Sequence, residues 1–208
     1  MENASKALIM AAEVLIGVVV ISIGVVLFSM FQNYSRDTID QMNQSKVTEF
    51  NNNFSKYVGT VSTFDSVKKK EVNIPINVSA HDVITAANFA RENNSYYGLK
   101  YDEVKSFYES TLYVKVDIDT RFPSKTYSNL ENWSEDSNEK TKFIDNNSVI
   151  FFNCTDGGNR PYTRCFKLEE VNRKYSPTTG RICYVKFTEY TKEEYQLLYD
   201  IEIFDILW

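Results

Sequence analysis

Residues 7–31 read ALIMAAEVLIGVVVISIGVVLFSMF, and this stretch decides the fold because Glu13 is its only ionisable residue. A bilayer core about 30 Å thick is crossed by a helix of about 20 apolar residues. A buried helix of a soluble domain is rarely apolar on all sides over such a length. A cleaved signal peptide has an apolar region of only about 7–15 residues and then a small-residue exit site, which is missing after Phe31. The stretch therefore predicts a membrane-spanning helix that anchors the rest of the chain.

The composition sets limits on the function. The chain has 208 residues and a net charge of −5, from 23 Lys+Arg and 28 Asp+Glu. Phosphate binding needs a basic face, so we do not expect nucleic acid as a partner. The residues after position 58 suffice for one domain with its own core.

Nothing in the sequence interrupts a helix where the chain leaves the membrane. No proline precedes Pro75, and no glycine lies between Gly24 and Gly59. Apolar residues recur on one helical face beyond the membrane, namely Ile39, Met42, Phe50, Phe54 and Tyr57. We therefore expect one helix from about Ala4 to Val58, with Gly59 as its C-terminal cap. Its first half fits a membrane, and its amphipathic second half fits the surface of a domain.

A second helix is expected from Ala80 to Asn93. Ser79 is suited to cap its first amides, and Asp82 completes a capping box. Its apolar stripe consists of Val83, Ala86, Ala87 and Ala90. His81, the only histidine, lies in the first turn, and we expect it to be solvated because a metal site needs several ligands.

Alternating residues then predict strands. The expected strands cover residues 112–119, 148–155, 162–171 and 181–190, and the second is apolar enough to lie in the centre of a sheet, buried on both faces. Turn signals at 156–161 and 176–180 join consecutive strands. We therefore predict an α+β fold in which an antiparallel β-meander packs on the long helix.

Two further segments are polar or ambiguous. Residues 129–147 are expected to form a loop with a helical turn, and the acidic residues 131–139 within it are expected to be solvated. The apolar tail 195–208 fits either a strand or a helix, and we expect it to be docked on the domain.

No arrangement of catalytic residues is recognisable. The sequence has a single histidine and contains no G-x-S-x-G, P-loop or C-x-x-C motif. Residues 156–159, DGGN, resemble part of a calcium loop but lack the spaced acidic ligands and the terminal Glu of an EF-hand. A hairpin turn explains them better. We therefore expect no enzymatic activity, no metal and no cofactor.

The three cysteines, Cys154, Cys165 and Cys183, allow at most one bridge within the chain. If Asp156 faces Thr163 across the first turn, Cys154 faces Cys165 at a Cα separation of about 4.5 Å, which suits a disulfide. The second turn places Cys165 far from Cys183. We therefore predict a Cys154–Cys165 bridge, and the alternative is three reduced, buried thiols.

Glu13 is the one candidate for a special role. An ionised carboxylate in hydrocarbon is costly, so acids within a membrane usually have a partner or a function. The alternative is that Glu13 lies shallow enough for its carboxylate to reach the headgroups. The sequence leaves both interpretations open.

The N-terminus resembles that of type IV pilins and pseudopilins, bacterial proteins with a short leader, a basic and a small residue at the cleavage site, and an apolar helix with a Glu near its start. Here the leader is residues 1–7, Lys6 and Ala7 match the basic and small pair, and Leu8 would begin the mature helix. The resemblance implies cleavage between Ala7 and Leu8. It also implies that Glu13 of one subunit neutralises the freed amine of a neighbour, which gives a buried charge its partner.

The expected organisation follows from this resemblance. It comprises a leader (1–7), a transmembrane and stalk helix (8–58) and an extracytoplasmic α+β domain (59–208). The leading hypothesis is a non-enzymatic, pilin-like surface or filament subunit that forms a homo-oligomer through its N-terminal helix. The alternatives are a monomeric, single-pass membrane-anchored domain that binds a surface partner, and a structural component of a larger envelope machine.

Overall fold

The computed structural model describes residues 2–100, 112–133 and 137–207, with the backbone alone at 33, 36–40 and 203–207. The chain divides into two compact units, residues 1–46 and 47–208. The helical segments are α1 (Glu2–Ser55), α2 (Ala80–Tyr96), η2 (Leu130–Asn132), α3 (Asn138–Asn147), η3 (Glu170–Asn172) and α4 (Lys192–Tyr199). The strands are β1 (Thr60–Asp65), β2 (Lys70–Pro75), β3 (Lys115–Arg121), β4 (Ser124–Tyr127), β5 (Val149–Cys154), β6 (Asn159–Thr163), β7 (Phe166–Lys167), β8 (Arg173–Tyr175), β9 (Ile182–Glu189) and β10 (Ile203–Leu207).

The first helix is continuous over 54 residues, close to the expected bounds, because no proline or clustered glycine interrupts it. Its last turns belong to the domain core. Phe54 is buried, and Phe50 is half-buried against the same cluster. Met42 is 54 % exposed, and the side chain of Ile39 lies outside the described residues. The expected packing face of the stalk is therefore confirmed only near the end of the helix.

Gly59 does not cap this helix, so that expectation is wrong. Its φ of +151° is a conformation that favours glycine, and its carbonyl accepts a hydrogen bond from the amide of Ile76 at 3.0 Å. A Cβ atom here would lie 2.8 Å from Cδ1 of Ile76. Glycine is needed at this position because two chain segments approach each other closely where the β1–β2 hairpin begins.

The second helix and its capping box are confirmed. Ser79 Oγ accepts a hydrogen bond from the amide of Asp82 at 3.2 Å, and Asp82 Oδ2 accepts one from the amide of Ser79 at 3.1 Å. All four residues of the predicted apolar stripe are buried, namely Val83, Ala86, Ala87 and Ala90. His81 is exposed in the first turn, as expected.

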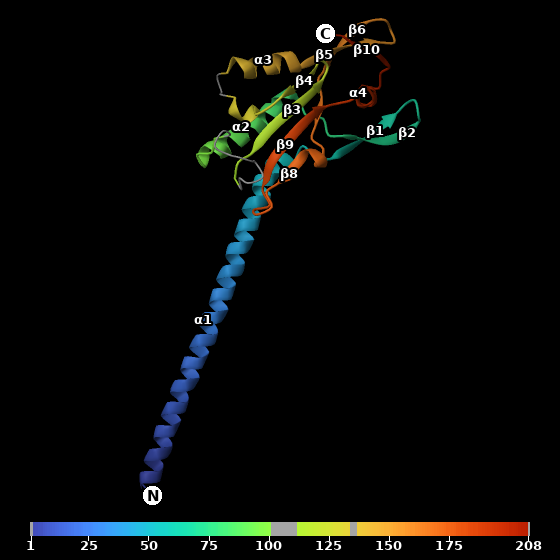
Figure 1. Cartoon of the computed structure of the whole chain (residues 1–208). Helices are drawn as coiled ribbons and strands as arrows, with labels where there is room; N and C mark the ends of the chain where they lie inside the picture. The colour runs from blue at the N-terminus through green and yellow to red at the C-terminus, as the bar shows by residue number, and fades with distance from the viewer. Residues whose placement is uncertain (1, 101–111, 134–136, 208) are drawn as a thin grey trace. The chain divides into compact units, whose positions relative to one another are not determined.

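The strands within the described residues form three sheets, so the predicted antiparallel meander is wrong (Figure 1). The largest sheet has the order β4-β3-β9-β7, with β8 also pairing with β9, and its two inner strands β3 and β9 are parallel. A second sheet has the order β10-β5-β6, and β1 and β2 form a third. Lys115 lies opposite Tyr184 in the parallel pair. Pairing across such a long sequence separation leaves no local signal in the sequence.

Both predicted hairpin turns exist, with differences. β8 and β9 flank the turn at 176–180, in which Gly180 has a φ of +67°. β5 and β6 flank a turn tighter than expected, with Asn153 opposite Asn159. β5 is central in its sheet, as predicted, but only one face is buried, because Phe152 is buried while Phe151 is 46 % exposed.

Three segments contain more structure than the sequence indicated. The expected loop at 129–147 contains η2 and the ten-residue helix α3, whose Phe143 side chain is buried. Positions 134–136 lie outside the described residues. The tail forms both a helix, α4, and a strand, β10, and β10 pairs with β5. Trp208 lies outside the described residues. The β1–β2 hairpin had no counterpart in the sequence analysis.

The described residues of the domain form two apolar clusters. In the larger cluster, the last turns of α1 and one face of α2 pack on the inner strands of the five-stranded sheet, where Val116 and Phe187 are completely buried. The smaller one lies around β5 and α4, with Phe152 and Tyr195 completely buried.

Candidate functional site

The N-terminal apolar helix is the strongest candidate for a functional element. Within the segment Glu2–Gln32, the most apolar stretch of 18 residues has a mean hydropathy of 2.9, and no residue of that stretch is buried. Among the described residues it is the one helix long and apolar enough to cross a membrane. Its large side chains are exposed along the whole segment, for example Ile9 at 55 % and Leu27 at 61 %. An apolar surface of this extent requires lipid or protein around it.

Glu13 lies within this apolar segment. Ile9 and Gly17, one turn away on either side, are its neighbours on the same helix face. A Cβ atom at Gly17 would meet nothing within 4 Å, so the space beside this residue is open. In the described part of the chain, the carboxylate has neither a hydrogen-bond donor nor an ion-pair partner.

The residues of the expected processing site lie on the same helix. Lys6 Nζ pairs with Glu2 Oε1 at 3.1 Å, and both side chains are largely exposed. Ala7 and Leu8 are helical, and Leu8 is 75 % exposed. The junction is thus accessible from outside the chain.

Elsewhere, the described residues contain no group of three or more His, Cys, Asp or Glu placed to hold a metal ion. His81 stands alone on the surface of α2. The remaining ionisable groups of interest are buried carboxylates, which the sequence analysis did not identify.

The first of these is Glu189, at the end of β9. Its carboxylate forms a bidentate pair with Arg164, at 2.7 Å from Nε and 3.0 Å from Nη2, and both side chains are almost completely buried. The amide of Arg121 donates to Glu189 Oε2 at 2.7 Å, and the hydroxyl of Tyr195 donates to Oε1 at 3.2 Å. Every charged oxygen is satisfied, which is the pattern of a structural ion pair. One pattern in the sequence indicates that Glu189 is buried: it follows Val185 and Phe187 at every second position of the strand, on the face that points into the core.

The second is Glu131 in η2, which is only 1 % exposed. The expectation that it lies in a solvated acidic loop is wrong. It accepts hydrogen bonds from the hydroxyl of Tyr113 at 2.8 Å and from the amide of Val116 at 2.9 Å. Burial raises the pKa of the carboxyl from 4.5 to about 7, and the nearby Asp117 contributes to that increase. Glu131 therefore ties η2 to the start of β3.

The predicted disulfide register is wrong. In the β5–β6 hairpin Phe152 faces Arg160, so the strand positions are offset from those that would place Cys154 opposite Cys165. All three cysteines are free and buried. The Cys154 thiol lies 3.7 Å from the hydroxyl of Tyr162, whereas the Cys165 thiol lies 3.5 Å from that of Tyr199. Burial raises the pKa of Cys165 to about 11, which makes this thiol unreactive near neutral pH.

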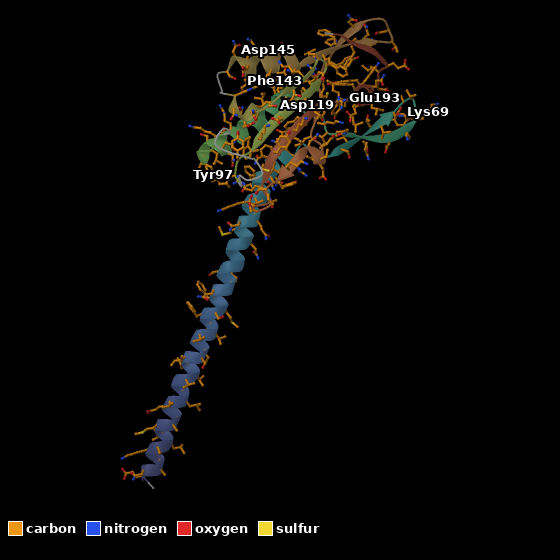
Figure 2. All side chains as sticks on the ribbon, in the orientation of Figure 1. Lys69, Tyr97, Asp119, Phe143, Asp145 and Glu193 are labelled. Atoms are coloured by element: carbon orange, nitrogen blue, oxygen red, sulfur yellow. The ribbon has the colours of Figure 1, made fainter. Side chains whose placement is uncertain are left out.

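A surface groove of about 640 Å³ lies between the β1–β2 hairpin and α4 with the residues that follow it. We call this the acidic groove. Its apolar lining includes Val67, Leu197 and Ile201, and its carboxylates include Glu193, Asp200 and Glu202. Figure 2 shows Glu193 on α4, on the side of the domain where Lys69 marks the hairpin tip.

Comparisons with known proteins add no assignment: no protein-family model, no curated protein and no solved structure matches the chain.

Proposed function

We propose that this protein is a non-enzymatic, pilin-like surface or filament subunit that is anchored, and assembles, through its N-terminal helix. The observation that carries the proposal is an apolar helix, Glu2–Gln32, whose surface is uncovered and contains the unpartnered Glu13. An acid in this position is costly in lipid and favourable beside a positive charge of a neighbouring chain. The α+β domain would then face the cell exterior.

The proposal gives specific roles to residues of the first turns. Lys6 and Ala7 would form the recognition pair for a prepilin peptidase, and Leu8 would carry the freed amine. Glu13 of one chain would pair with that amine in the next. Gly17, one turn from Glu13, leaves room for a second helix to approach closely.

A second candidate function is a monomeric, single-pass membrane-anchored domain that binds a surface partner. One observation favours it: Glu13 is the sixth residue after Ala7, whereas the Glu of pilins is the fifth residue after the cleavage point. Under this alternative Glu13 reaches the headgroups, and no contact between helices is required.

Cross-linking in the membrane separates the two candidates. A Val20→Cys substitution places a thiol on the same helix face as Glu13 and Gly17. Mild oxidation of membranes should trap a disulfide-linked dimer, since each chain carries one accessible thiol, and adding Glu13→Ala should abolish the dimer without reducing membrane insertion. The matched control is Glu49→Ala, which removes an exposed acid outside the apolar segment and should leave the dimer yield intact. A dimer yield that persists in the Glu13→Ala chain would refute the assembly role, and a chain that never forms the dimer would support the monomeric anchor.

A further inference from the structure

We propose that the domain has its own self-association surface, in which the lysine-rich tip of the β1–β2 hairpin of one copy binds the acidic groove of a second copy. This inference concerns residues 47–208 only and goes beyond the proposed function, because it holds whether or not Glu13 mediates assembly.

The hairpin tip presents an apolar residue followed by lysines. Residues 67–70 read Val-Lys-Lys-Lys, and the Val67 side chain is 81 % exposed. Lys68 pairs with Asp65 at 3.3 Å, whereas Lys69 and Lys70 form no ion pair within the described structure. The tip therefore carries two free positive charges beside an uncovered apolar side chain.

The tip is also held in a fixed conformation. Asp65 Oδ1 accepts hydrogen bonds from the amides of Val67 at 3.0 Å and of Lys68 at 2.9 Å, and Lys69 has a φ of +49°. The hydrogen bond from the amide of Lys68 lowers the pKa of Asp65, so the carboxylate that organises the turn stays ionised. A preorganised tip loses little conformational entropy on binding.

The acidic groove has the complementary properties. Glu193, Asp200 and Glu202 are exposed and have no ion-pair partner in the described part of the chain. The pKa of Glu193 is lowered by hydrogen bonds from its own amide and from Thr191, which keeps this carboxylate charged. Leu197 and Ile201 are only half-buried, so an apolar side chain entering the groove would find apolar contacts. A cationic tip led by Val67 fits both the charge and the polarity of this surface.

The geometry favours a second copy of the chain as the occupant. Tip and groove adjoin on one molecule, since Val67 and Lys68 form part of the groove wall. Two copies facing each other across a two-fold axis would therefore place each tip on the groove of the other. Such a contact is self-complementary and closes as a dimer. Its electrostatic part should weaken as salt is added.

Zero-length carbodiimide cross-linking tests this directly. Unlabelled and isotope-labelled full-length chains are mixed in detergent micelles, cross-linked and digested. Mixed-isotope peptides that join Lys69 or Lys70 to Glu193, Asp200 or Glu202 are expected, with a yield that falls in about 0.5 M salt. Their absence, or tip-to-groove links found only within one isotope, would overturn the proposal.

Charge reversal supplies the matched variants. Lys69→Glu/Lys70→Glu and Glu193→Lys/Glu202→Lys should each lower the mixed-isotope yield at least about tenfold when assayed alone. Each variant also removes groups that the carbodiimide joins, so the decisive measurement is the mixture of the two. Mixing these two variants pairs opposite charges at both contacts and should restore cross-linking between them, which a folding defect could not do. The control Lys125→Glu/Lys142→Glu reverses two exposed lysines on other elements and should leave the yield unchanged. A failure of the mixture to restore cross-linking would count against the contact.

Discussion

Replacement of Glu189 by Gln should destabilise the domain severely. Glu189→Gln keeps the shape of the side chain but removes the charge opposite Arg164, whose side chain is only 2 % exposed. Removing the carboxylate beside a buried guanidinium costs about 3–5 kcal/mol. Since domains of this size are stable by about 5–15 kcal/mol, the variant should lose a large fraction of its free energy of unfolding.

The assay is urea unfolding of the full-length chain in detergent, followed by tryptophan fluorescence, because Trp133 packs on Tyr127 and Phe143. The matched control is Glu170→Gln, which removes an ion pair with Arg173 at 3.2 Å from an acid that is 80 % exposed. Arg173 is only 10 % exposed, but it keeps its hydrogen bond to Ser55 Oγ, and the carboxylate that is removed is solvated. A pair with a solvated carboxylate contributes about 1 kcal/mol or less, so this variant should remain close to the wild type.

A double variant tests the physical reason. Arg164→Met/Glu189→Gln removes the buried guanidinium as well, and it should be more stable than Glu189→Gln alone by about 1 kcal/mol or more. The reasoning is refuted if Glu189→Gln costs no more than the Glu170→Gln control. It is also refuted if adding Arg164→Met to Glu189→Gln makes the chain less stable.

Three further outcomes follow from the structure. The folded-state pKa of Glu131 is raised to about 7, so the stability that its protonated carboxyl contributes is present below about pH 4.5 and is lost as the pH rises through 7. Over that window the free energy of unfolding of the wild type should fall by about 3 kcal/mol relative to that of Glu131→Gln, as measured by urea unfolding at each pH. Gly59→Ala should cost about 1–3 kcal/mol because the new Cβ meets Ile76 and φ is positive, and in the same assay Gly158→Ala should be nearly neutral; equal costs would contradict this account. A thiol titration should count three free cysteines in the unfolded chain and few in the native one, with Cys165 among the slowest to react; a count of one would show that a disulfide exists.

The sequence was sufficient for elements that a local pattern determines. The long helix follows from an apolar run without breakers, and α2 follows from a capping box and a stripe with helical spacing. The turn at 176–180 follows from its proline and glycine. In each case the residues that determine the structure lie within a few turns of one another.

Pairing between distant segments could not be predicted in this way. The parallel contact of β3 with β9 depends on which strands bury their apolar faces together, and no local residue encodes it. The tighter β5–β6 turn shifted the register and with it the expected partner of Cys154. α3 was missed because its sequence is mostly polar and Phe143 is its only fully buried apolar side chain.

The candidate site residues also differ in whether a local pattern identifies them. Glu13 stood out from the sequence because an acid in an apolar run is exceptional. The buried pair of Glu189 with Arg164 and the acidic groove became visible only when segments far apart in the sequence were brought together. Glu131 was misjudged because a run of acidic residues usually marks a solvated loop.

The most direct test of the central proposal is the intact mass of the full-length chain isolated from membranes of cells that express a prepilin peptidase. The account predicts a mature protein that lacks residues 1–7 and begins at Leu8, with Lys6→Ala reducing the processed fraction. A chain that keeps Met1 under these conditions would contradict the pilin-like assignment.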